Sequence, residues 1–197
     1  MTLTLQTAPT EEPVSLVEAK LHCRVFVDDE NALIEALIEA ARMHCESYTQ
    51  LAFVTQAWDY KLDGFPCGAL WLPKAPLLAS SPGTAPVVTY TDTDGATQTF
   101  SSSLYTVDAP SGPHARQGRL FLNYQQVWPS TRAIEHAVAV RFSCGYGAAS
   151  AVPDGIKAAM KLLISHWFNT REPVNTGNIA TTIPQTVDQL LWPYKSF

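Results

Sequence analysis

Two histidine–cysteine dipeptides are the residues whose types and spacing first suggest chemistry. His22-Cys23 and His44-Cys45 offer imidazole and thiolate groups, which are common ligands of zinc. Adjacent residues on a helix point about 100° apart, so one dipeptide rarely directs both groups at one ion. We therefore predict that these four residues are partly buried helix positions and that the chain has no metal site.

A second set of side chains could take part in acid–base chemistry. Asp108, His114 and Arg116 lie in or beside one segment rich in proline and glycine. A polar surface loop explains them more simply than a catalytic set does. The sequence has no glycine-rich phosphate loop, no HExxH and no GxSxG. We predict no catalytic residue and no cofactor, and a small cytoplasmic enzyme is kept only as an alternative.

Four aromatic residues could form a platform for a peptide or a sugar. Trp58, Tyr60, Trp71 and Tyr90 fall in segments with strand-like alternation. Aromatic side chains at strand spacing more often belong to the core. A soluble ligand-binding β module is therefore a further alternative.

The charge balance bears on the class of partner. The 197 residues include 13 basic and 18 acidic side chains, and charged residues make up only 16%. Typical soluble domains have about 25%, so sparse charge suggests surfaces that partners cover. The net charge is −5, which argues against a general nucleic-acid binder. Residues 1–50 carry a net −6 and the rest a net +1.

The four cysteines and the hydropathy pattern indicate a cellular setting. Cys23, Cys45, Cys67 and Cys144 are widely spaced and form no CxxC, so we predict reduced thiols in a cytoplasmic protein. No run of 18 or more apolar residues is present, so we predict no membrane span. Residues 1–13 lack the pattern of a secretory signal and read as a flexible arm.

Helices are predicted on either side of a β section. Ser15 and Glu18 form a capping-box pattern at the start of a short helix. A longer helix over about 29–49 is predicted to be capped by Asp28 or Asp29. Its apolar stripe would face the core, and its other face would be solvated, form a subunit contact or make an acidic lining. The residues assigned to that other face are Glu35, Glu39, Arg42 and Glu46.

The section over 52–145 reads as six or seven short strands. Residues 54–62 alternate as a strand does, and Asp94-Gly95 is a strong hairpin signal. Helix returns over 153–170, where Pro153 and Asp154 mark its start. Neither set of helices can bury its apolar stripe alone, so we expect the two to pack together. The prediction is one α+β domain over 14–172, with an antiparallel β section inserted between helices.

The C-terminal tail over 173–197 is predicted to be a partner-binding segment. Its polar linker, 174–183, is followed by a cluster of apolar and aromatic side chains, which often anchor interfaces. Folding back onto the chain's own core is the equally weighted alternative. The cluster comprises Leu190, Leu191, Trp192, Tyr194 and Phe197.

An ordered series of segments resembles one known family. The series begins with PVSLVEAKLH at 13–22, passes through Asp28-Asp29 and continues with LIEALI at 33–38. The further matching segments are 40–42, 56–59, 72–77, 87–95, 128–132, 137–142, 145–147, 152–159 and 166–167. Together they are similar to the head–tail connector (adaptor) proteins of tailed phages. These are the gp6-like or phiE125 gp8-type connectors, and they include relatives in gene transfer agents.

The resemblance implies a structural role. Members form a ring, commonly of twelve copies, beneath the portal protein, and the ring joins the head to the stopper or tail-terminator protein. DNA passes through the ring without specific binding. The location implied is the neck of the virion, after assembly in the host cytoplasm, and the C-terminal segment would reach the portal.

The acidic helix has a place in this scheme. An acidic channel would repel DNA phosphates and let the duplex slide. We therefore expect some of Glu30, Glu35, Glu39 and Glu46 to face the lumen or a subunit boundary. A stopper or tail-completion protein is the alternative within virions. Those proteins are typically β-dominated and lack paired N-terminal helices, so residues 15–49 favour the adaptor.

Overall fold

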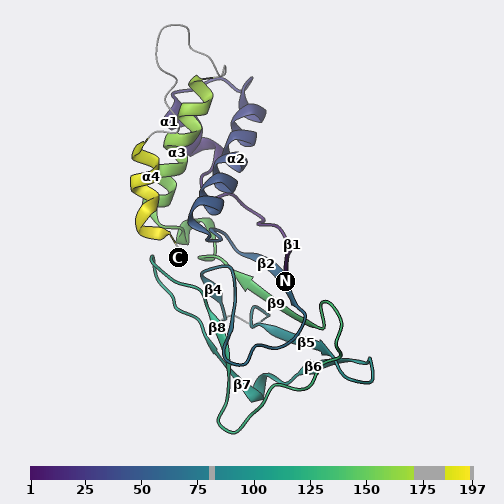
Figure 1. The fold of residues 1–197 in the computed structure, drawn as a ribbon. Helices are drawn as coiled ribbons and strands as arrows, with labels where there is room; N and C mark the ends of the chain where they lie inside the picture. The colour runs from purple at the N-terminus through teal and green to yellow at the C-terminus, as the bar shows by residue number, and fades with distance from the viewer. Residues whose placement is uncertain (80–82, 171–184, 196–197) are drawn as a thin grey trace.

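The computed structural model describes residues 1–79, 83–170 and 185–195. Helices gather at one end of the molecule and strands at the other (Figure 1). The helices are α1 (Leu16–Cys23), α2 (Asn31–Thr49), α3 (Asp154–Asn169) and α4 (Gln185–Leu191). Short 3₁₀ turns are η1 (Ser102–Leu104), η2 (Ala149–Ala151) and η3 (Trp192–Tyr194). The predicted α+β fold, with a β section between N- and C-terminal helices, is confirmed.

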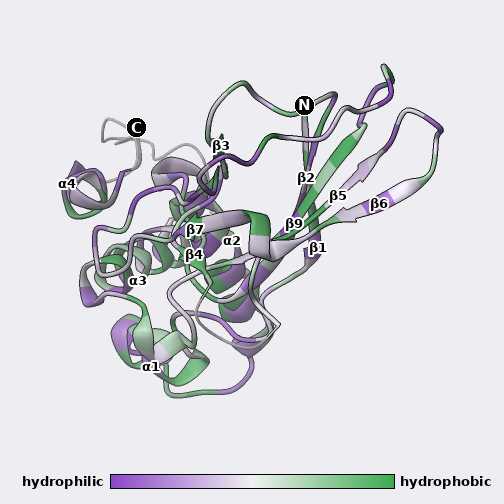
Figure 2. Cartoon of the chain, turned by 90° about the horizontal axis from the view of Figure 1, so that it is seen from below, coloured by the Kyte–Doolittle hydropathy of each residue, from purple (hydrophilic) through white to green (hydrophobic). Residues whose placement is uncertain are grey.

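The strands form two antiparallel sheets. They are β1 (Thr2–Thr7), β2 (Gln56–Leu62), β3 (Leu70–Trp71), β4 (Leu77–Leu78), β5 (Val87–Thr91), β6 (Thr97–Phe100), β7 (Tyr105–Asp108), β8 (Arg119–Leu122) and β9 (Val138–Cys144). The larger sheet has the order β1-β2-β9-β5-β6, with β4 also paired to β9, and the smaller has the order β3-β8-β7. Figure 2 shows the five strands of the first order side by side.

The N-terminal arm differs from the expectation for residues 1–13. Residues 2–7 form β1, which pairs with β2 so that Leu3 lies opposite Tyr60. The alternating sequence TLTLQT suits a strand, and β1 satisfies backbone groups that β2 would otherwise leave open at the sheet edge. The prediction of a flexible arm is therefore wrong for these six residues.

The starts of the first two helices are built differently. Glu18 donates its backbone N–H to Ser15 Oγ at 3.3 Å, and Ser15 donates its own N–H to Glu18 Oε2 at 2.8 Å, which completes the predicted capping box. The bond from the Ser15 N–H to the Glu18 carboxylate, with a second from Ser15 Oγ at 2.7 Å, lowers the pKa of Glu18. Helix α2 has Glu30 at its N-cap, with no side-chain cap bond. Asp28 instead accepts a bond from Lys20 Nζ at 2.7 Å, so the predicted aspartate cap is wrong.

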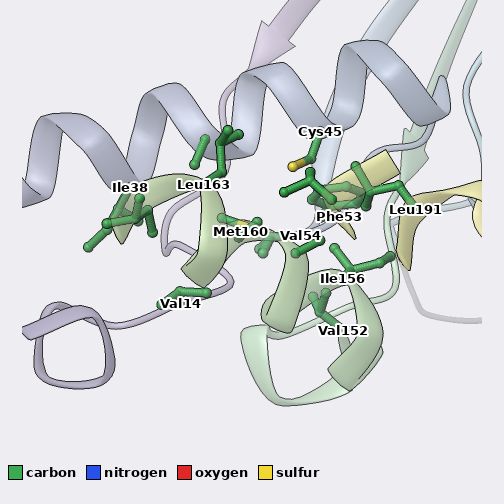
Figure 3. Close-up of a cluster of buried hydrophobic side chains, with 14 of the residues drawn as sticks. Val14, Ile38, Cys45, Phe53, Val54, Val152, Ile156, Met160, Leu163 and Leu191 are labelled. Atoms are coloured by element: carbon green, nitrogen blue, oxygen red, sulfur yellow. The ribbon is translucent and has the colours of Figure 1, made fainter. Parts of the chain in front are cut away.

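Two hydrophobic cores share one connecting segment. The helical core is made by α1 to α4, and the β core is made by the inner faces of the sheets. Between α2 and β2, Ala52 joins the β core, whereas Phe53 and Val54 join the helical core. Figure 3 shows Phe53 among side chains that include Cys45 and Leu191. Residues 52–54 therefore fix the two halves of the protomer to each other.

A buried carboxylate holds this segment in place. Glu46 Oε1 accepts hydrogen bonds from the Phe53 N–H and from Gln56 Nε2, both at 2.8 Å. Glu46 Oε2 accepts a bond from Arg42 Nη1 at 3.2 Å, and Arg42 Nε donates to Glu12 Oε2 at 2.8 Å. One side chain of α2 thus links the helix to the connecting segment, to β2 and, through Arg42, to the chain before α1.

This position corrects one sequence expectation. Only 11% of the Glu46 side chain is exposed, so it lies inside the protomer and not on the exposed face of α2 to which the sequence pattern assigned it. Burial raises the pKa of Glu46, while the bond from Phe53 and the charge of Arg42 act in the opposite direction. The helical periodicity alone is compatible with a place for Glu46 on the outer face of α2. The segment that follows α2 folds back over the turn that contains Glu46 and buries it.

Across the described ranges, no helix is both long and apolar enough to cross a lipid bilayer.

Replacing Glu46 by alanine should strongly destabilise the protomer. The Glu46→Ala chain leaves the Phe53 N–H, the Gln56 amide and Arg42 without this acceptor, and loss of one partner of a buried pair costs about 3–5 kcal/mol. The exposed Glu35 on the same helix is the control, since Glu35→Ala should change stability by no more than about 0.5 kcal/mol. Urea unfolding followed by circular dichroism measures both, and equal effects would contradict the assigned role.

The titration of Glu46 should be visible in the pH dependence of stability. Because burial raises its folded-state pKa above the ordinary 4.5, the folded chain binds this proton more tightly than the unfolded chain does. The stability contributed by Glu46 therefore falls as the pH rises from about 4.5 through the raised pKa. Glutamine does not titrate, so the stability advantage of the natural chain over Glu46→Gln should shrink across that interval. An advantage that grows with pH would refute the raised pKa.

Candidate functional site

The histidine–cysteine dipeptides are placed as helix residues. Cys45 is fully buried in the helical core, and burial raises the pKa of its thiol to about 12. His44 packs edge-on against the Trp167 ring, with centroids 6.0 Å apart, and His22 is exposed on α1. The part of the chain that the structure describes has no cluster of three or more His, Cys, Asp or Glu side chains suited to a metal. All four cysteines are free thiols.

The three residues of the acid–base alternative have different partners. Asp108 accepts a bond from Arg119 Nε at 2.9 Å. His114 Nδ1 lies 3.1 Å from the Pro193 carbonyl oxygen, and the exposed Arg116 has no hydrogen bond or ion pair to either of the other two. They therefore form no proton-transfer chain with one another.

The four aromatic residues that could form a ligand-binding platform lie in different environments. Trp58, Tyr60 and Tyr90 pack against the β core, as the strand spacing predicts. Trp58 also donates its Nε1–H to Gln56 Oε1 at 3.1 Å. Trp71 differs, because 53% of its surface is exposed and the Arg119 guanidinium lies 5.1 Å from its ring centroid.

The remaining acidic residues lie at the surface of the helical end. Glu35 and Glu39 are exposed, and Glu30 is half-buried at the N-cap of α2. Glu35 and Glu39 border a hollow of about 660 Å³, whose apolar floor includes Val14 and Ile38. The other charged residues of its lining are Glu11, Glu12, Glu18 and Lys157. The contribution of the segment before α1 could not be predicted from the sequence, because only the fold brings that segment beside α2.

The C-terminal residues are folded onto the protomer. Leu191 is fully buried in the helical core and Leu190 is half-buried against it, so α4 completes the core that α3 begins. This differs from the expectation that both side chains are free to bind a partner. Trp192 is 59% exposed and Tyr194 is half-buried. Phe197 and the linker at 174–183 lie outside the described residues.

Two apolar faces of the helical end are left exposed by the residues that the structure describes. The side of α2 opposite the core presents Leu33, Ala36, Ala40 and Met43, which are all exposed. These residues recur at spacings of three and four, so the sequence contains a second apolar stripe on this helix. Glutamates lie next to these positions, which made this side of the helix read as a solvated face. Met43 is 58% exposed.

The second apolar face lies on α1 and the turn that follows it. Val17 and Leu21 project from α1 with 75% and 71% of their surfaces exposed, and Phe26 and Val27 follow with 85% and 58%. Four large apolar side chains exposed so close together are typical of a surface that another protein covers. The protomer therefore has two distinct apolar faces at its helical end.

Comparison with known proteins gives these surfaces a context. Residues 13–75 match the family described as phage gp6-like head-tail connector protein. No curated protein matches the chain.

Solved structures match over the whole chain. A chain from the neck of an empty gene transfer agent (GTA) particle with C6 symmetry superposes with a TM-score of 0.78 at 19% identity, covering 100% of this chain and 96% of that chain. A chain from the neck of a native GTA particle with C12 symmetry gives a TM-score of 0.75 at 18% identity, with the same coverage. The resemblance seen in the sequence is thereby confirmed: residues 13–75 match the phage gp6-like head–tail connector family, and the chain has, throughout its length, the fold of a chain from the neck of GTA particles.

Proposed function

We propose that this connector forms a ring in the neck of a phage-like particle, beneath the portal, and joins the head to the stopper or tail-terminator protein while DNA passes through its centre. The observation that carries the proposal is the match of the whole fold to a chain from the neck of GTA particles, together with the connector family match over residues 13–75. The ring would contain twelve copies in the virion and would assemble in the host cytoplasm.

The two apolar faces support a ring. A closed ring is built from heterologous contacts, in which one surface of a subunit meets a different surface of the next. The α2 face around Ala40 and the α1 face around Leu21 are two different surfaces of the same protomer. We propose that each is covered by a neighbouring copy. Glu35 and Glu39 adjoin the α2 face, which would place them at a subunit boundary or on the lumen.

The exposed part of the C-terminal turn supports contact with the portal. Trp192 is a large aromatic side chain at the surface, and tryptophan is enriched among residues that dominate interface energies. We propose that Trp192 and Tyr194, rather than the buried Leu191, contact the partner protein.

The direct test of the function is the location of the protein in purified particles. Cryo-electron microscopy of the particle neck should show ring density at the base of the portal into which this fold can be built, because a connector occupies that position. Particles that form and carry tails but contain none of this protein would overturn the proposal.

Substitution within the α2 face should prevent ring formation without unfolding the protomer. Ala40→Asp places a charge in the centre of the proposed contact, where its desolvation is unfavourable. We expect incorporation into particles, measured by quantitative immunoblotting, to fall at least about tenfold, the equivalent of about 1.4 kcal/mol.

The matched control for that substitution is Ala133→Asp, which changes an exposed alanine of the β section in the same way. It should be incorporated normally. Circular dichroism and thermal melting of both purified variants check that each is folded. Normal incorporation of a folded Ala40→Asp chain would refute the contact.

A further inference from the structure

One pocket of the molecule lies apart from the two proposed ring contacts, and its lining includes Trp192 and Tyr194, the proposed portal contacts. It has a volume of about 480 Å³ and lies where the loop over 109–118 meets the C-terminal turn η3. Its lining residues are Trp71, His114, Ala115, Arg116, Gln117, Trp192, Pro193, Tyr194 and Lys195. The pocket thus combines residues from the β section with the end of the helical part.

Several contacts hold the walls of this pocket in place. The His114 ring stacks on Tyr194 with centroids 5.2 Å apart, and its Nδ1 is within hydrogen-bond distance of the Pro193 carbonyl. At the neighbouring residue of the loop, the Tyr146 hydroxyl donates to the Pro113 carbonyl at 2.9 Å. Ala115, which follows these two attachments in the chain, is 7% exposed. The loop is therefore anchored at two consecutive residues and by a buried alanine.

The pocket is cationic although the chain is acidic overall. The cations Arg116 and Lys195 contribute to its lining, and among the described residues no carboxylate does. The Lys195 ammonium lies over the Tyr48 ring, 5.0 Å from its centroid. Nearby Arg119 is paired with Asp108, whereas Arg116 is exposed and has no hydrogen bond or ion pair with any residue of the described ranges. Arg116 is therefore available to an incoming anion.

We propose that this pocket binds a carboxylate-bearing, aromatic segment of a neighbouring protein. The planar guanidinium of Arg116 suits a bidentate bond to a carboxylate, and the exposed Trp71 and Trp192 rings offer apolar contact to an aromatic side chain. Duplex DNA fits this site less well, because its binders carry basic residues along an extended face rather than in one hollow. The inference rests on the proposed function only in assuming that the connector has protein neighbours.

A binding measurement with the full chain tests the inference. The probe is a short fluorescein-labelled peptide of glutamate and phenylalanine, titrated with protein and followed by fluorescence anisotropy. Arg116→Glu should weaken binding at least about tenfold, because it replaces attraction by repulsion. The matched control Arg132→Glu reverses another exposed arginine, outside the pocket, and should change the affinity by less than about twofold.

Three results would overturn the inference. These are failure of the natural chain to bind the peptide, equal weakening by both substitutions, and displacement of the peptide by duplex DNA at lower concentration than by unlabelled peptide. Thermal melting confirms that both variants are folded. The measurement uses the isolated chain, so it is independent of whether the protein is found in particle necks, which tests the proposed function alone.

Discussion

The carboxylate of Glu46 is the interaction on which the arrangement of the two halves depends. It lies inside α2, one turn beyond Arg42, yet it accepts the backbone N–H of Phe53 and the amide of Gln56. Burying an ionisable group without hydrogen-bond partners costs free energy. Here the hydrogen bonds of the Glu46 carboxylate offset that cost, and they also fix the path of the chain between helix and sheet. With that path fixed, Phe53 enters the helical core and Ala52 the β core. Residues 52–54 thereby connect the two cores of the protomer rigidly.

The packing of the helices onto the helical core leaves other apolar side chains of α1 and α2 exposed. One side of helix α2 contacts α3 and the connecting segment. The opposite side is exposed, and it includes Leu33 and Met43. Helix α1 likewise buries Ala19 and leaves Leu21 exposed. A monomer rarely exposes such faces, whereas the ring subunit that we propose would need them to meet a neighbour on each side. The low charge content of the chain has the same explanation.

Much of the fold followed from local patterns. The capping box at Ser15, the strand within 54–62 and the hairpin around Asp94-Gly95 depend on residues close in sequence, and the structure agrees with them. What could not be predicted depends on residues distant in sequence. Glu46 reads as a solvated helix position until the backbone of Phe53 is placed against it. Similarly, β1 is a strand only because β2 provides an edge, and Leu191 is a core residue only because α3 is beside it.

The composition of the helical core also determines when it can form. Its buried members run from Val14 near the start of the chain to Leu191 near the end, whereas the buried members of the β core all lie between Ala52 and Cys144. During synthesis, the β core can therefore close while the last part of the chain is still being made. The helical core must wait until α4 has left the ribosome. Since contacts between distant segments form slowly, α1 and α2 remain incompletely packed in the nascent chain. The surfaces that would contact neighbouring subunits are thus the last to take their final shape.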